Sequence, residues 1–120
     1  MGILFVMPQT VLIVDDHAGF RRAARALLEA EGYLVVAESA TGLDALQAVD
    51  RFHPDMVLLD IGLPDVDGLE VCRRLAGTGP TVVLTSSRDA SDYPGVERIG
   101  ARGFIPKAEL SGDTLAAVAA

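Results

Sequence analysis

The sequence has little cysteine, few basic residues and no long hydrophobic run. Its single cysteine, Cys72, excludes an internal disulfide and a thiolate metal cluster, and this usage fits a reduced compartment. Ten Lys and Arg residues stand against 17 Asp and Glu residues, a formal net charge of -7, which argues against a protein that binds nucleic acid or an anionic membrane, because both need a basic face. The apolar run Ile3 to Met7 is too short for a membrane span and lacks the basic start of a signal peptide. We therefore expect a cytoplasmic protein that binds neither nucleic acid nor membranes directly.

The sequence has enough apolar residues for one core. The chain is 120 residues long and 50% hydrophobic, which is typical of one compact domain. No repeat or linker divides it. We expect a leader over residues 1–8 and a single domain over residues 9–120.

Five short apolar runs predict β-strands. They are Val11 to Val14, Tyr33 to Ala37, Met56 to Leu59, Val82 to Leu84, and Phe104 to Ile105. Because these runs do not alternate with polar residues, we expect strands that are covered on both faces.

The segments between these runs have helical spacing. The first predicted helix has a face with helical spacing and ends at Gly32, and Arg21, Arg22 and Arg25 are expected on its exposed side. The face consists of Phe20, Ala23, Ala24, Leu27, Leu28 and Glu31. The second is capped by Thr41, buries Leu43, Leu46, Val49 and Phe52, and ends at Pro54.

Three further helices are weaker or shorter. One begins with a capping box of Asp67 and Glu70 and buries Leu69, Cys72, Leu75 and Ala76. Pro94 and Gly95 interrupt the next, Ala90 to Ile99, and the last carries Leu115 and Val118. Five strand and helix pairs predict an α/β fold with a doubly wound, five-stranded parallel sheet in the flavodoxin-like order 2-1-3-4-5.

Polar side chains stand where four of the strands end. Asp15 and Asp16 follow the first strand, Asp60 the third, Thr85 the fourth and Lys107 the fifth. Ligands of open α/β sheets bind at this edge, so we expect these side chains to converge there. Three carboxylates would repel one another unless a cation neutralised them, and an oxygen donor set favours Mg²⁺.

Such a site suits phosphoryl transfer. A carboxylate beside Mg²⁺ can attack a phosphoryl group, and a lysine and a hydroxyl aimed at the same oxygens would stabilise the developing charge. Lys107 and Thr85 qualify for these roles. The basic residues are nine arginines and one lysine, so the only compact ammonium of the chain stands at this strand end.

Four motifs now identify the family that the chain resembles. Residues 11–17 (VLIVDDH), 57–68 (VLLDIGLPDVDG), 82–86 (VVLTS) and 103–107 (GFIPK) resemble, in order and spacing, the receiver domain of two-component response regulators. The resemblance covers residues 10 to about 118. It implies that Asp60 accepts a phosphoryl group from a histidine of a sensor histidine kinase.

The resemblance also implies the remaining site roles. Asp15 and Asp16, with Asp60 and the backbone carbonyl of Gly62, would bind Mg²⁺. Lys107 would pair with the phosphoryl group.

Two further residues form the switch that the resemblance implies. Thr85 would move to hydrogen-bond the phosphoryl group, and Phe104 would swing inward as Thr85 moves.

The receiver resemblance sets the expected output. The domain would catalyse its own phosphorylation and slow dephosphorylation and would act as a signalling domain, not as an enzyme on other substrates. Residues 107–112 (KAELSG) resemble receivers linked to helix-turn-helix DNA-binding output domains, which implies transcription regulation through a domain that is absent from this chain. A homodimer is left open.

Two departures from the family pattern bear on function. Gly62, two residues after the acceptor, leaves the approach to Asp60 open to water, so we hypothesise a short-lived phosphoryl state. Pro94 and Gly95 fall within the fourth helix, which belongs to the signalling face of the family.

Other interpretations remain. The chain could be a receiver-like interaction module that works without phosphorylation, or an aspartyl phosphatase of the haloacid dehalogenase type. That phosphatase normally has Asp-x-Asp after the first strand and needs room for a cap. Asp65 and Asp67 are interpreted as turn and cap residues, His17 as a surface residue near the pocket that is not a ligand, and Cys72 as a core residue.

Overall fold

The computed structural model describes residues 8–87 and 93–119. In chain order these form β1 (Thr10–Val14), α1 (Ala18–Ala30), β2 (Leu34–Ser39), α2 (Gly42–Phe52), β3 (Met56–Asp60), α3 (Gly68–Leu75), β4 (Thr81–Ser86), β5 (Gly103–Pro106) and α4 (Gly112–Ala119). Short 3₁₀ helices, Val96–Ile99 and Lys107–Glu109, flank β5. Residues 1–7 of the expected leader lie outside the described residues. No helix within the described ranges has both the length and the apolar character that a membrane crossing needs.

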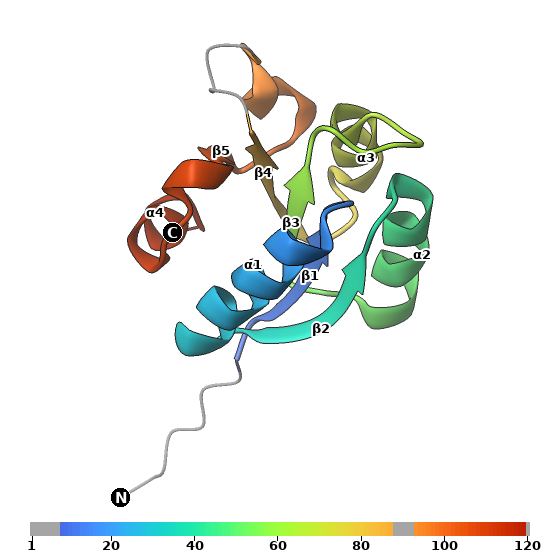
Figure 1. Ribbon diagram of the computed structural model, residues 1–120. Helices are drawn as coiled ribbons and strands as arrows, with labels where there is room; N and C mark the ends of the chain where they lie inside the picture. The colour runs from blue at the N-terminus through green and yellow to red at the C-terminus, as the bar shows by residue number, and fades with distance from the viewer. Residues whose placement is uncertain (1–7, 88–92, 120) are drawn as a thin grey trace, which may run out of the picture.

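The five strands form one parallel sheet in the order β2-β1-β3-β4-β5 (Figure 1). This confirms the predicted doubly wound α/β fold. Because the strands are parallel, their carboxyl ends lie at one edge of the sheet, and the register pairs Asp60 with Thr85 there.

Helices cover both faces of the sheet. α1 and α4 pack on one face through Ala24, Leu28 and Leu115, and α2 and α3 pack on the other. Along β3, Met56 and Leu58 face the α1 and α4 side, whereas Val57 and Leu59 face the α2 and α3 side. The apolar runs are continuous because both faces of each central strand are buried.

The predicted helix caps are confirmed. Thr41 Oγ1 accepts a hydrogen bond from the Asp44 amide at 3.1 Å, and Asp67 Oδ1 accepts one from the Leu69 amide at 2.9 Å. α1 ends before Gly32, whose φ of 93° lies in the left-handed region.

The predicted apolar face of α2 is wrong at its ends. Ala45 and Val49 are buried, whereas Leu43 is 54% and Phe52 43% exposed. Each step of three residues leaves a helical position rotated by about 60° from the last, so a strict three-residue spacing from 43 to 52 winds around the helix. The buried face follows the spacing of three and four residues instead.

Two details predicted for α3 are also wrong. Ala76 is the exposed residue that ends the helix, and Val71 is buried in its place. The Glu70 carboxylate pairs with Arg73 at 3.3 Å and with Arg74 at 3.4 Å and does not reach back to complete a capping box. The guanidinium groups of Arg73 and Arg74 lie one helical turn after Glu70 and bind its carboxylate, so the carboxylate does not turn back toward the start of the helix.

The fourth predicted helix is replaced by a 3₁₀ helix, Val96–Ile99, in the part of the segment that the structure describes. Residues 90–92 of the predicted helix lie outside the described residues. Val96 is buried and Ile99 packs against the core. Gly95, at a φ of 80°, precedes this short turn and prevents a regular helix from running through it.

Candidate functional site

Strand alternation places the polar residues at the sheet edge on one side. Asp15 follows Ile13, and Asp60 follows Leu58, by two positions, so both carboxylates belong to the face covered by α1 and α4. Thr85 pairs in register with Asp60 and shares that face. The same alternation along β5 carries Lys107, two residues after Ile105, to the same side.

The two acids that follow β1, Asp15 and Asp16, are called the acid pair here, and they differ in exposure. The Asp15 side chain is fully buried, whereas that of Asp16 is 32% exposed. The backbone amide of His17 donates to Asp15 Oδ1 at 2.8 Å, which fixes the turn between β1 and α1. This turn aims both carboxylates at the edge of the sheet.

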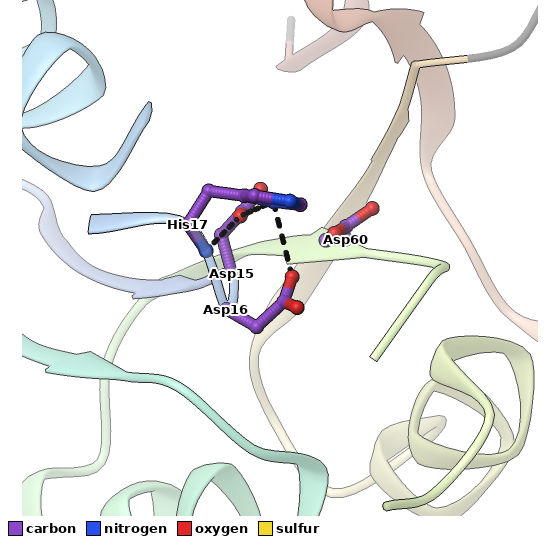
Figure 2. Close-up of side chains that lie close together, drawn as sticks. All are labelled: Asp15, Asp16, His17 and Asp60. Atoms are coloured by element: carbon purple, nitrogen blue, oxygen red, sulfur yellow. Dashed lines mark hydrogen bonds and ion pairs between the residues drawn. The ribbon is translucent and has the colours of Figure 1, made fainter. Parts of the chain in front are cut away.

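His17 lies on the surface, as expected, but it contacts both acids. Its Nδ1 is 3.0 Å from Asp15 Oδ1 and 3.1 Å from Asp16 Oδ1. Figure 2 shows the ring across the two carboxylates, with Asp60 projecting from the end of the neighbouring strand. One ligand atom from each of Asp15, Asp16, His17 and Asp60 lies within 4.8 Å of the others.

Asp60 is 4% exposed and makes two contacts through its carboxylate. The Gly62 amide donates to Oδ1 at 3.2 Å, and Lys107 Nζ donates to Oδ2 at 3.3 Å. Burial and the charge of Asp15 raise the pKa of Asp60 against the lowering effect of these two donors. A cation at the site would therefore relieve a real electrostatic cost.

Lys107 bridges the two buried acids. Its Nζ lies 2.6 Å from Asp15 Oδ2 and 3.3 Å from Asp60 Oδ2. Burial alone would lower its pKa, but the hydrogen bond and charge of Asp15, with those of Asp60, outweigh burial and raise the pKa of Lys107. The Phe20 ring, whose centroid lies 4.7 Å from Nζ, covers another side of the ammonium.

Thr85 carries an unused hydroxyl. The residue is fully buried, and its Oγ1 has no hydrogen-bond partner in the part of the chain that the structure describes. A buried polar atom without a partner costs free energy, so this hydroxyl is available for an acceptor that enters the site.

Phe104 lies on the opposite face of the sheet from Thr85. It is half-buried, and the centroid of its ring lies 5.8 Å from that of the Tyr93 ring, with an angle of 36° between the two ring planes. Phe104 pairs in register with Leu84, the residue before Thr85. A shift of β4 would therefore reach both side chains.

The donor set fits a hard divalent cation. Asp15, Asp16 and Asp60 offer carboxylate oxygens within 4.8 Å of one another, and the one cation among the described residues that contacts both buried acids is Lys107. Oxygen donors of this kind suit Mg²⁺. The nitrogen of His17 is the one donor that this ion does not favour.

Sequence reasoning missed two residues around the site. Arg21, predicted to be exposed, is only 20% exposed and donates from Nη1 to the Asp15 carbonyl at 2.7 Å. Gly68 approaches the main chain so closely that a Cβ there would collide with the carbonyl of Asp60. The position of Gly68 inside the motif of residues 57–68 could have indicated that it has a structural role. The contact of Arg21 could not be predicted in this way, because it depends on how α1 crosses the sheet.

Known proteins of one family resemble this chain. Residues 11–119 match the model of the response regulator receiver domain. A putative transcriptional regulator of Pseudomonas aeruginosa is 42% identical over 113 residues, which cover 92% of this chain and 55% of that protein. The virulence factors putative positive transcription regulator BvgA of Bordetella pertussis is 41% identical over 106 residues, or 86% of this chain and 51% of that protein.

A solved structure shares the fold. The crystal structure of a two-component response regulator of the LuxR family from Aurantimonas sp. SI85-9A1 superposes with a TM-score of 0.81 at 27% identity, covering 94% of this chain and 86% of that one. The chain spans about half the length of the two curated relatives above.

Proposed function

Since the chain belongs to the response regulator receiver domain family, we propose that Asp60 accepts a phosphoryl group from a sensor histidine kinase in a Mg²⁺-dependent reaction. The observation that carries this proposal is the placement of Asp60. Its buried carboxylate lies within 4.8 Å of the acid pair and 3.3 Å from Lys107 Nζ. This arrangement gathers a nucleophile, a cation site and a fixed ammonium at one sheet edge.

The proposed transfer exchanges one bond to phosphorus for another. An Asp60 carboxylate oxygen attacks the phosphorus, the new P–O bond forms as the P–N bond to the kinase histidine breaks, and the imidazole takes a proton. Water later attacks the phosphorus of the acyl phosphate, which returns the carboxylate and releases inorganic phosphate. Both steps are catalysed by the domain itself.

Asp15, Asp16, Asp60 and the Gly62 carbonyl are the groups that would hold Mg²⁺. When bound, the ion would neutralise the negative charge that otherwise repels the phosphoryl group from the carboxylates. Lys107 then binds a phosphoryl oxygen, because its ammonium already reaches Asp60 Oδ2. Its second contact, with Asp15, holds the ammonium in place.

The switch uses Thr85 and Phe104. The unpartnered Thr85 hydroxyl hydrogen-bonds the phosphoryl group, and Phe104, which pairs in register with Leu84, swings inward as Thr85 and β4 move. The changed surface then alters contact with a partner. We expect this partner to be a DNA-binding output domain or a second copy of the domain.

The test is phosphorylation with a small donor. Incubation with acetyl phosphate and Mg²⁺ should add one phosphoryl group by intact mass, and peptide mapping should place it on Asp60. Asp60→Asn should abolish the gain. Asp67→Asn is the matched control, because Asp67 only caps α3 and asparagine can still cap it.

The result also separates the alternatives. A wild-type domain that gains no mass under these conditions would contradict the proposal and favour an interaction module that works without phosphorylation. Modification that persists in Asp60→Asn would assign the acceptor to another residue.

A further inference from the structure

Arg21 links three elements beside the acid pair. From the first turn of α1, its Nη1 donates to the Asp15 carbonyl at 2.7 Å, and its Nε donates to Glu38 Oε1, on β2, at 3.1 Å. One planar guanidinium therefore binds the end of β1 and the end of β2 at the same time. A lysine ammonium could not reproduce this fork.

The contacts close a ring around the main chain of one residue, Asp15. The Asp15 amide donates to the Ser39 carbonyl at 3.0 Å, and Ser39 follows Glu38 directly on β2. Arg21 completes the ring, because it binds the Asp15 carbonyl on one side and Glu38 on the other. Both polar groups of Asp15's main chain are thereby held.

Glu38 is itself held in place by a second arginine. Arg25 Nε donates to Glu38 Oε2 at 2.7 Å, one helical turn after Arg21. The hydrogen bond from Arg25 and the charges of both arginines lower the pKa of Glu38 despite its partial burial. The carboxylate that orients Arg21 is therefore ionised near neutral pH.

We propose that Arg21, oriented by Glu38, is a positioning residue that fixes the peptide between Asp15 and Asp16. The Asp15 carbonyl belongs to that peptide, so its plane sets the directions of the two carboxylates relative to each other. We call the two contacts of Arg21, with the Asp15 carbonyl and with Glu38, the clamp. Loss of the clamp leaves both acids present but lets the peptide rotate. This inference rests on the proposed function, because it assigns Arg21 a role in Mg²⁺ binding.

The test compares Arg21→Ala with Arg22→Ala. Arg22 is the matched control: it is the next residue, carries the same charge, is exposed and has no hydrogen bond or ion pair among the described residues. By calorimetric titration, we expect Arg21→Ala to bind Mg²⁺ about tenfold more weakly than the wild type, because one charge-assisted hydrogen bond is lost. We expect Arg22→Ala to bind Mg²⁺ as tightly as the wild type. Equal affinities of the two folded variants would overturn the proposal.

A kinetic readout separates positioning from general destabilisation. Phosphorylation of Arg21→Ala by acetyl phosphate should need more Mg²⁺ for half-maximal rate and should recover most of the wild-type rate at saturating Mg²⁺. A rate that stays low at saturation, with unchanged Mg²⁺ dependence, would contradict a positioning role. If Arg21→Ala does not fold, Glu38→Gln and Arg21→Lys should each give a smaller shift in the same direction, and no shift in either would count against the clamp.

A metal-free readout tests the clamp independently of the proposed function. In wild-type protein without metal, the Asp15 amide is held by Ser39, and Arg21→Ala should make its hydrogen exchange roughly tenfold faster than Arg22→Ala does. If wild-type protein binds no Mg²⁺, the proposed function fails, and this exchange rate still decides the clamp. Equal exchange in both variants would refute it.

Discussion

At the scale of single residues, Gly62 lies beside the Asp60 carboxylate. Its amide binds Asp60 Oδ1, and a Cβ built at Gly62 would meet only that oxygen, at 3.9 Å. The contact is ordinary van der Waals distance, so a side chain fits there without strain. The space beside the acceptor is therefore open for water.

We predict that Gly62→Asn lengthens the life of the phosphoryl group. An asparagine side chain would occupy the space from which water attacks the acyl phosphate. The half-life should rise about fivefold, close to 1 kcal/mol in activation free energy. Loss of the added mass over time measures it, with Gly62→Ala as an intermediate, and an Asn variant that hydrolyses as fast as the wild type would disprove this role.

The raised pKa of Asp60 predicts that Asp60→Asn stabilises the metal-free protein at neutral pH. Burial and the charge of Asp15 raise the pKa in the folded state, so ionisation of Asp60 costs folding stability above that pKa. The isosteric amide removes this charge, and Lys107 keeps its contact with Asp15. The melting temperature should rise by about 3–5 °C, on the order of 1 kcal/mol.

The pH dependence of this effect has a definite sign. The stabilisation should be full at neutral pH and should shrink as the pH falls through the folded pKa of Asp60, because the wild-type carboxyl then becomes neutral as well. Thermal melts in a chelator from pH 7 down to pH 4 measure it. A difference that stays constant over this range would show that charge is not the cause.

At the scale of elements, helix ends depend on side chains that the sequence shows directly. Thr41 and Asp67 cap α2 and α3 as predicted from their residue types. α2 has a second cap that the sequence did not reveal, since Asp65, in the loop after β3, accepts from the amides of Gly42 and Leu43. That loop and the start of α2 are therefore tied together beside the site.

A reciprocal cap at the start of α4 predicts a stability effect. Ser111 Oγ accepts from the Thr114 amide at 3.1 Å, and Thr114 Oγ1 accepts from the Ser111 amide at 2.9 Å. Ser111→Ala should lower the free energy of unfolding by about 1 kcal/mol, because an amide of the first turn loses its acceptor. Urea denaturation measures the loss. Ser111→Asn should retain most of the stability, and equal losses in both variants would contradict a capping role.

At the scale of the whole molecule, the sheet edge brings together residues that are far apart in the sequence. Asp60, Thr85 and Lys107 stand at the ends of three neighbouring strands, β3, β4 and β5. Thr85 and the half-buried Phe104 lie on opposite faces of the sheet. If Asp60 carries a phosphoryl group as proposed, a shift of β4 beside it would therefore reach both helical layers.

We predict that Lys107→Ala separates modification from response. The variant keeps Asp60 and the acid pair, so acetyl phosphate should still add a phosphoryl group, although more slowly. Without the ammonium that joins β5 to the site, amide chemical shifts of β4, β5 and α4 should change far less on phosphorylation than in the wild type. Shift changes of wild-type size in phosphorylated Lys107→Ala would show that Lys107 does not transmit the signal.

The sequence alone was sufficient for the fold and for the position of the acids. Continuous apolar runs separated by helical segments identify buried parallel strands, and a parallel sheet necessarily gathers the residues after its strands at one edge. Spacing was less reliable on helix surfaces, where Leu43 and Phe52 proved exposed, and between Pro94 and Ile99, where a short 3₁₀ turn replaced a helix.

Only the tertiary structure decided which long side chains meet at the site. The contacts of Lys107 with Asp15, of Arg21 with the Asp15 carbonyl and of Arg21 with Glu38 join segments that are 92, 6 and 17 positions apart. Local periodicity specifies the face on which a residue lies, but not how a helix crosses the sheet or which rotamer a flexible cation adopts. Those choices arise when all five strands pack together, so the sequence located the acids and the packed fold determined their partners.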